Sequence, residues 1–305
     1  MKQIDLHLIR PLNTSERWYS MATIWIPILA SLYALISGML FHMHLSTFML
    51  LIFCYSCTVF GVTIGFHRLL THRSFKANRW LKIILVCFGC MAYEGPPFFW
   101  IAAHRRHHKY TDTEFDPHSP ISCEKKSLIG FYHAHMGWMP SHILESWRYY
   151  LADLLADKDL LLINKHYSII AFSGIFIPGM INGLLFMTWY HFFEGIIVCG
   201  LFRVCLQQQV TWSINSICHM WGKKDFITND NSRNNWLCAL LSYGEGWHNN
   251  HHAFPSSAKH GLTKGQIDFS YWLIYLFSLF GLVQQIKSPT QEQMQQKYLS
   301  DGNNE

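Results

Sequence analysis

Two long stretches of this chain contain no lysine or arginine, one from Trp18 to His67 and the other from His166 to Phe202. A helix needs about 20 apolar residues to cross the hydrocarbon core of a bilayer. The first stretch has room for two crossings, and the second has room for two if its last helix continues past Arg203. We therefore predict an all-α membrane protein with four transmembrane helices arranged as two hairpins. The predicted spans are Ser20–Phe41, Thr47–Gly65, Ser168–Trp189 and Phe192–Trp212.

The basic residues gather outside these stretches. By the positive-inside rule, this places both termini and the sections 67–165 and 215–286 on the cytoplasmic side, where we expect a helical cap. Only 14% of the residues are charged, against about 25% in a typical soluble domain. The net charge of +5 is too small to indicate nucleic-acid binding. We expect residues 1–286 to form a single domain, and the polar tail 287–305 to be disordered.

Nine of the 19 histidines fall into motifs on the predicted cytoplasmic side. In HRRHH and HNNHH, offsets of three and four residues bring side chains to one face of a helix, as a metal site requires. The five-residue offset in HRLLTH predicts a departure from regular α-helix. A further histidine follows the last span in NSICH. The candidate ligands are His67, His72, His104, His107, His108, His219, His248, His251 and His252.

Nine imidazoles are too many for one catalytic zinc, which usually has three protein ligands, and are about right for two metals. Imidazole suits iron, zinc, copper and nickel. The motifs lie next to the predicted membrane spans, where the expected substrates are acyl chains. Hydrolysis by zinc would need a scissile bond there, whereas oxygen chemistry with iron needs only a C–H bond, so iron is favoured. We expect the other histidines, including His135 and His260, to be ordinary residues, and His118 to pack near the site without binding metal.

Five motifs resemble the acyl-CoA desaturase family, of the stearoyl-CoA Δ9 type with its bacterial and acyl-lipid relatives. They are GVTIGFHRLLTHRSFKA, HRRHHKYTDTEFDPHS, HMGWM, TWSINSICHMWG and GEGWHNNHHAFP, and the resemblance covers residues 61–255. It implies four membrane helices beneath a cytoplasmic helical cap that holds two iron ions. It also implies that one iron is bound by His67, His72, His104, His108 and His251, and the other by His107, His219, His248 and His252.

The resemblance adds three further positions to the site. Asn215 falls on the family's asparagine that contacts a metal through water, and Thr211 and Trp212 fall on residues that line the bend of the acyl tunnel. Carboxylates often orient the imidazoles that bind a metal. By their proximity in sequence, the candidates for this role are Asp112, Asp116 and Glu245.

The implied reaction uses O2 and two electrons to introduce a cis double bond, expected at Δ9, into a saturated fatty-acyl chain. The electrons would come from a separate donor, a ferredoxin or a b-type cytochrome with its reductase, in a bacterial inner membrane. Ala102 and Ala103 replace an Arg-Asp pair that helps to bind CoA in eukaryotic relatives, so CoA, lipid and acyl carrier protein all remain possible carriers. The alternatives are a hydroxylase with the same di-iron site and a membrane zinc hydrolase.

Overall fold

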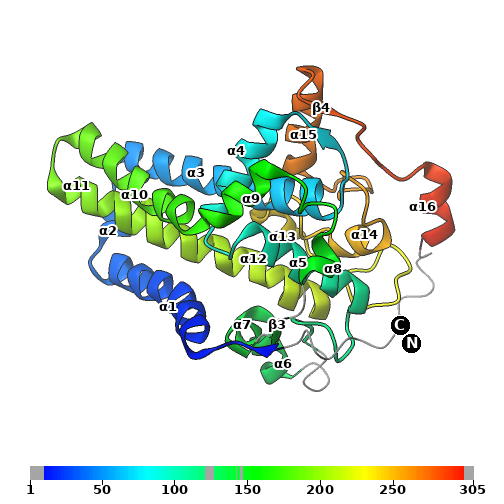
Figure 1. Cartoon of the computed structure of the whole chain (residues 1–305). Helices are drawn as coiled ribbons and strands as arrows, with labels where there is room; N and C mark the ends of the chain where they lie inside the picture. The colour runs from blue at the N-terminus through cyan, green and yellow to red at the C-terminus, as the bar shows by residue number, and fades with distance from the viewer. Residues whose placement is uncertain (1–9, 121–126, 142, 145–146, 299–305) are drawn as a thin grey trace.

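The computed structural model describes residues 10–120, 127–141, 143–144 and 147–298. Long helices form an extended bundle on one side of the molecule, and shorter helices and loops gather at the other end (Figure 1). The chain passes between these two regions several times, so that the ends of long helices lie among the shorter elements.

Four helices are long and apolar enough to cross a membrane, as the sequence predicts. The second is α3 continued by the π-helical segment η2, and the fourth joins α11, the π-helical segment η4 and α12. Their bounds are α1 (Thr14–Ile36), α3 (Leu45–Phe60), η2 (Gly61–Thr71), α10 (Tyr167–Phe186), α11 (Trp189–Glu194), η4 (Gly195–Phe202) and α12 (Arg203–Met220).

The bounds of the spans differ most from those expected at four ends. The first helix begins at Thr14, because Asn13 and Glu16 form a capping box, and it ends at Ile36, just before Gly38 adopts a left-handed conformation. The second and fourth helices continue to Thr71 and Met220, well past the predicted Gly65 and Trp212. These extensions carry metal-site candidates out of the apolar bundle.

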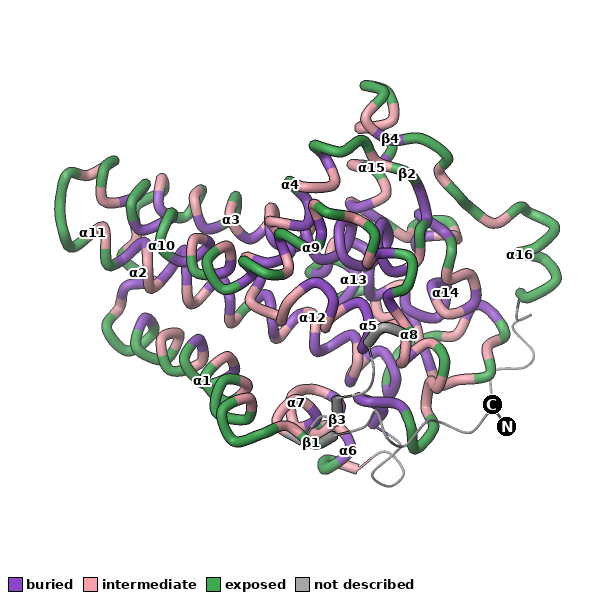
Figure 2. Tube along the Cα trace, in the orientation of Figure 1, coloured by how far each residue is buried: buried purple, intermediate pink, exposed green. Residues whose placement is uncertain are grey.

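Large apolar side chains are exposed along the four long helices, and buried segments are frequent around α5 (Pro97–Tyr110), α12 and α14 (His248–Ala253) (Figure 2). Exposed examples are Ile36, Phe53 and Leu184, whose exposed fractions are 84%, 63% and 67%. Contiguous exposed apolar surface of this extent is unfavourable in water and favourable in lipid. The exposure pattern therefore agrees with the hydropathy of the helices.

Several polar groups inside the bundle are paired with one another or with backbone carbonyls. Arg203 is buried and donates hydrogen bonds to the carbonyl oxygens of Met91 and Gly174, at 2.6 and 2.7 Å. Buried charges within a span are costly unless they are compensated in this way. Arg203 therefore ties the start of α12 to the two segments beside it, and α12 carries Asn215 and His219.

The remaining elements are short. The helices are α2 (Met39–His42), α4 (Arg79–Cys90), α5 (Pro97–Tyr110), α6 (Leu128–Tyr132), the π-helical segment η3 (His133–Gly137), α7 (Trp138–Ser141), α8 (Trp147–Leu151), α9 (Lys158–Lys165), α13 (Trp236–Leu241), α14 (His248–Ala253), α15 (Phe269–Leu279) and α16 (Gln291–Lys297). Two antiparallel pairs join β1 (Arg10–Pro11) to β3 (Ile143–Leu144) and β2 (Lys76–Ala77) to β4 (Val283–Gln284).

Residues 287–298 of the polar tail lie within the described part of the chain. They contain α16, which begins with a capping box formed by Thr290 and Gln293. Tyr298 then forms an isolated β-bridge with Phe226, and the two rings pack edge to face. The structure thus places a helix within the tail that composition predicts to be disordered, and residues 299–305 lie outside the described part of the chain.

Glycines allow η2 and α4 to approach closely. A Cβ atom at Gly61 would lie 2.2 Å from the backbone nitrogen of Gly89, and a Cβ at Gly65 would lie 3.0 Å from the carbonyl oxygen of Leu85. Side chains of both segments, including Ile64, Phe66 and Leu85, belong to one core cluster. Because η2 also carries His67, the packing of η2 against α4 sets the position of part of the site.

We predict that Gly61→Ala lowers the midpoint of thermal unfolding in detergent by about 5 °C, because overpacking typically costs about 1–3 kcal/mol. Met49→Ala, on the exposed face of α3, is the control and should change the midpoint by less than about 2 °C. Equal midpoints for the two variants would contradict the close packing of η2 on α4.

Candidate metal centre

Nine histidines form two adjoining clusters, and within each cluster the ligand atoms lie within 4.8 Å of one another. The five-histidine cluster contains His67, His72, His104, His108 and His251. The four-histidine cluster contains His107, His219, His248 and His252. The structure thus groups the histidines into the same two sets that the family resemblance implies. The clusters adjoin through His108 and His252, whose ring centroids are 4.5 Å apart.

The first motif uses a π-helix to bring two histidines together. His67 lies within η2, and His72 follows its last residue and donates its backbone N–H to the carbonyl oxygen of His67. A π-helix places residues i and i+5 one turn apart, and the two rings are accordingly 4.8 Å apart. The predicted departure from regular α-helix is therefore confirmed.

The other two motifs each supply both clusters. On α5, His104 and His108 lie one turn apart with their Nε2 atoms 3.1 Å from each other, whereas His107 belongs to the four-histidine cluster. On α14, His251 joins the five-histidine cluster, while His248 and His252 join the other. In both motifs, the HxxHH spacing thus directs histidines of one helix into two different clusters, and not all three into one cluster.

The spacing of the Nε2 atoms fits metal coordination. Pairs within the clusters are separated by 2.9 Å (His108 and His251), 3.0 Å (His219 and His248), 3.1 Å (His67 and His251) and 3.4 Å (His107 and His252). Two nitrogens bound side by side to a metal at about 2.0–2.1 Å are separated by roughly 3 Å. The buried Nε2 atom of His72 also has no hydrogen-bond partner in the described part of the chain. Both clusters can therefore bind a metal ion.

In four of the rings, a carboxylate contacts the Nδ1 atom, and Nε2 faces the cluster. The Nδ1 atoms of His107 and His252 lie 2.9 Å from Asp116 and Asp230, and that of His219 lies 3.4 Å from Asp112. Glu245 contacts the Nδ1 atom of His67. A carboxylate on Nδ1 orients the ring and directs Nε2 toward a metal. The structure thus places Asp112, Asp116 and Glu245 where the sequence analysis expects them, and it adds Asp230.

A buried arginine fixes Glu245. The guanidinium of Arg68 is fully buried and lies 2.9 Å from Glu245 and 3.0 Å from Asp268. It also donates a hydrogen bond to the carbonyl oxygen of Ala258. Because two carboxylates and a carbonyl share its charge, Arg68 connects η2 to the loops on either side of α14. This network holds His67 and Glu245 in a single orientation.

Electrostatics favour the neutral form of six of the imidazoles and the ionised form of three carboxyl groups. Burial, with help from neighbouring imidazoles, lowers the pKa of six rings well below 6.5: those of His72, His104, His108, His248, His251 and His252. Burial opposes ionisation of Asp112, Asp116 and Glu245. Hydrogen bonds and nearby histidines outweigh this effect of burial, so the pKa of each carboxyl lies below its usual range. For Glu245, the positive charge of Arg68 lowers the pKa further. Neutral imidazoles are the form that binds a metal.

The two asparagines of HNNHH position α14. The side-chain oxygen of Asn249 accepts hydrogen bonds from the backbone N–H groups of Asp225 and Phe226, both at 2.8 Å. The side-chain amide of Asn250 donates to the carbonyl oxygen of His260 at 2.7 Å. A Cβ atom at Gly246 would lie 2.0 Å from the backbone nitrogen of Ala239, so only glycine fits before this helix.

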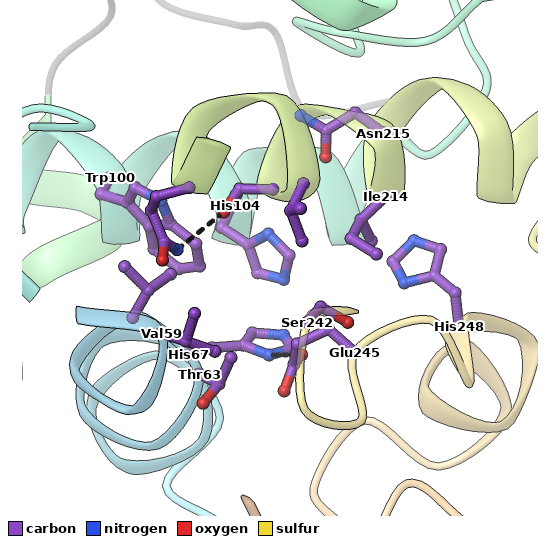
Figure 3. Close-up of a pocket in the computed structure, with 14 residues that line it drawn as sticks. Val59, Thr63, His67, Trp100, His104, Ile214, Asn215, Ser242, Glu245 and His248 are labelled. Atoms are coloured by element: carbon purple, nitrogen blue, oxygen red, sulfur yellow. Dashed lines mark hydrogen bonds and ion pairs between the residues drawn. The ribbon is translucent and has the colours of Figure 1, made fainter. Parts of the chain in front are cut away.

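A small cavity of about 40 Å³ lies beside the clusters and is lined by His67, His104, His248, Thr211 and Asn215. In Figure 3 the rings of His67, His104 and His248 are directed toward this cavity from different elements, with Asn215 across from His67. A second cavity of about 50 Å³ adjoins it along Trp100, His104, Thr211 and Asn215, and Trp212 also lines it. Asn215 precedes His219 by one turn of α12.

One histidine near the centre is not predicted from the sequence, and two others lie as expected. His260, expected to be an ordinary histidine, is buried, and its ring lies 4.6 Å from that of His251 and next to Glu245. His118 packs against His107 at 4.4 Å between ring centroids, close to the site as expected. His135 lies outside the clusters and contacts Ser216 and Gln209. No spacing signal distinguishes His260 from the other isolated histidines.

The fold and the site together define a helical protein with four candidate membrane spans and two histidine clusters able to bind metal. The family model for fatty acid desaturases matches residues 44–266. The chain therefore belongs to the fatty acid desaturase family, whose members are membrane-bound oxidoreductases and generally iron-dependent.

Three curated relatives show the range of the family. The chain is 38% identical over 256 residues to a hex-5-enoyl-[acyl-carrier protein] acetylenase of Moorena producens (strain JHB), covering 82% of this chain and 80% of that protein. It is 38% identical over 239 residues to an acyl-CoA C20 Delta5-desaturase of Anemone leveillei, covering 77% and 72%. It is 37% identical over 239 residues to Delta-9 acyl-lipid desaturase 1 of Arabidopsis thaliana, covering 76% and 72%.

We predict that His251→Ala reduces the metal bound per chain by about half, because only the five-histidine cluster loses a nitrogen. Elemental analysis of the purified protein measures this loss. His166→Ala, which removes an exposed histidine, should leave the metal content unchanged. Full metal content in His251→Ala would contradict the assignment of His251 as a ligand.

We also predict that the iron-loaded protein retains its metal at pH 6.0. An ordinary histidine with a pKa of about 6.5 is roughly three-quarters protonated there. The lowered pKa values of His104 and His251 favour the neutral, metal-binding form at that pH. Dialysis at pH 6.0 and 7.5 followed by iron analysis should give equal contents, and loss of half the iron at pH 6.0 would count against this prediction.

Proposed function

We propose that this chain is an O2-dependent fatty-acyl desaturase that binds two iron ions, one in each histidine cluster, and introduces a cis double bond into a saturated acyl chain, at Δ9. The observation that carries this proposal is the pair of clusters, which present nine imidazoles to two adjoining volumes beside a cavity. The chain's membership of the desaturase family supports the same reaction.

Iron ions bound in the clusters would supply the activation of O2 that is needed to remove hydrogen from two adjacent methylene groups. O2 accepts four electrons in all, two from the acyl chain and two from an external donor. The acyl chain loses two hydrogens and leaves with one double bond, and O2 takes up these hydrogens and two protons from solvent and leaves as two water molecules. An external donor of two electrons is therefore part of the proposal.

The protein's own groups hold this arrangement in place. The nine imidazoles would bind the two ions, and Asn215 would contact one of them through a water molecule. Asp112, Asp116, Asp230 and Glu245 hold four of the rings from their Nδ1 atoms. Such preorganisation fixes the reacting position without rearrangement during the reaction.

Thr211 and Trp212 would guide the acyl chain. Thr211 lines both small cavities beside the clusters, and Trp212 lines the second of these and a larger cavity of about 500 Å³ against α1. The three cavities therefore follow one another past Trp212 toward the histidines. We propose that the acyl chain occupies this path, with its reacting carbons nearest to His67 and His104.

The acyl carrier is CoA, a membrane lipid or acyl carrier protein. Relatives of this chain are named for each of these carriers. Ala102 and Ala103 are both buried on α5 and provide no charged group for a CoA phosphate. This feature favours a lipid or a carrier protein.

We further propose that the centre and both chain termini face the cytoplasm of a bacterial inner membrane. The lysine- and arginine-free segments are separated by the basic section that contains α5, and such sections remain on the cytoplasmic side. A ferredoxin or a b-type cytochrome with its reductase would deliver the electrons. Basic residues beside the centre, such as Lys109, offer a surface to an acidic donor.

The test is expression in a host with a compatible donor, followed by mass spectrometry of total fatty acids with double bonds located by derivatisation. We expect a new monounsaturated acid with the wild-type protein and none with His251→Ala, which leaves the apolar spans unchanged. Sorting the products into CoA, lipid and carrier-protein fractions at early times identifies the carrier.

The other outcomes separate the alternatives. A hydroxy acid in place of the monounsaturated acid would retain the iron centre and replace desaturation with hydroxylation. Zinc in place of iron in the purified, active protein would support a hydrolase and contradict the proposal. Turnover by His251→Ala equal to that of the wild type would contradict the assigned ligand set.

A further inference from the structure

A carboxyl group lies on the path between the large cavity and the metal centre. Glu94 precedes the Gly95-Pro96-Pro97 turn that leads into α5. It lines both the cavity of about 500 Å³ against α1 and the cavity of about 50 Å³ beside His104. An acyl chain that extends from the first cavity to the second must therefore pass Glu94.

The partners of Glu94 are neutral. The indole Nε1 of Trp100 donates a hydrogen bond to one carboxyl oxygen at 3.1 Å, and the side-chain amide of Gln207 donates to the other at 3.4 Å. The hydroxyl of Thr211 is a third partner. Within the described part of the chain, no lysine, arginine or histidine forms an ion pair with Glu94. An ionised Glu94 would thus have no positive charge to compensate it.

We propose that Glu94 must be protonated when an apolar acyl chain occupies these cavities, so that acyl binding takes up one proton from solvent. The identity of the ligand as an acyl chain rests on the proposed function. An empty cavity admits water, which can hydrate a carboxylate, whereas a bound acyl chain displaces that water. Retaining the ionised form beside methylene groups would carry a large desolvation cost.

The surroundings already bias Glu94 toward this behaviour. Burial raises the pKa of Glu94 to about 7, although its three hydrogen-bonding partners lower it in part. Removal of the remaining water raises the pKa further in the complex. A group whose pKa rises on binding takes up a proton between its two pKa values, so affinity is highest at low pH and decreases above the pKa of the free protein.

Other titratable groups face this region from each neighbouring element, and none of them substitutes for Glu94. The phenols ordinarily ionise near pH 10, Arg203 donates to backbone carbonyls, His104 belongs to the five-histidine cluster, and Glu16 is a partly exposed helix-capping residue. These groups are Glu16 and Tyr19 on α1, Tyr55 on α3, Tyr93 beside Glu94, His104 on α5, His118 after α5, Tyr167 on α10 and Arg203 on α12.

The test measures binding of radiolabelled methyl palmitate, which has no titratable group, to the metal-loaded protein in detergent between pH 6 and pH 9. For the wild type we expect the dissociation constant to rise about tenfold per pH unit above pH 7. Glu94→Gln retains the hydrogen-bonding shape and should vary less than twofold. Glu292→Gln, which changes an exposed carboxyl group on α16 that lines neither cavity, is the control and should follow the wild type.

A second measurement remains informative if Glu94→Gln does not fold. Calorimetry of the wild type at pH 7.5, in buffers of different ionisation enthalpy, should show net proton uptake on binding. The proposal is overturned by a dissociation constant independent of pH, by an equal pH dependence in Glu94→Gln, by absence of proton uptake, or by absence of binding at pH 6. Binding is measured without turnover, so pH-linked binding without any fatty-acid product would contradict the proposed function alone.

Discussion

The structure depends on the close packing of nine imidazoles, several of whose Nε2 atoms lie about 3 Å from one another. Where both Nδ1–H groups are donated to carboxylates, as in His107 and His252, the two Nε2 lone pairs face each other. Protonated rings at this distance would repel as like charges. A metal ion in each cluster removes this conflict, because every ring then directs its lone pair to a cation. The carboxylates on Nδ1 supply the balancing negative charge and fix the ring orientations.

Much of the surrounding architecture serves this arrangement. The candidate ligands come from segments far apart in the chain, and local backbone geometry, ion pairs or hydrogen bonds fix the position of each segment. The π-helix η2 brings His67 and His72 together, Arg68 joins Glu245 to Asp268, and the asparagines of HNNHH attach α14 to the preceding loop. Arg203 anchors α12 within the bundle, and the helix then carries Asn215 and His219 to the centre.

The sequence predicts the number of apolar helices, the nine histidines and their division into two clusters, because helical spacing and family motifs both carry that information. It does not predict Asp230, His260 or Glu94, which reach the site through loops and turns whose paths depend on tertiary packing. It also places the helix ends several residues away from those observed, since hydropathy marks where apolar residues stop and not where helical hydrogen bonding stops. The α16 helix forms in a polar segment through its own capping box.

The central claim is that the two clusters hold two iron ions bound by imidazoles. X-ray absorption at the iron K edge, combined with elemental analysis of the purified wild-type protein, tests it most directly. The account predicts two iron ions per chain, with a shell of nitrogen or oxygen ligands and the multiple scattering typical of imidazole. One iron per chain, zinc as the main metal, or an iron shell without an imidazole signal would contradict it.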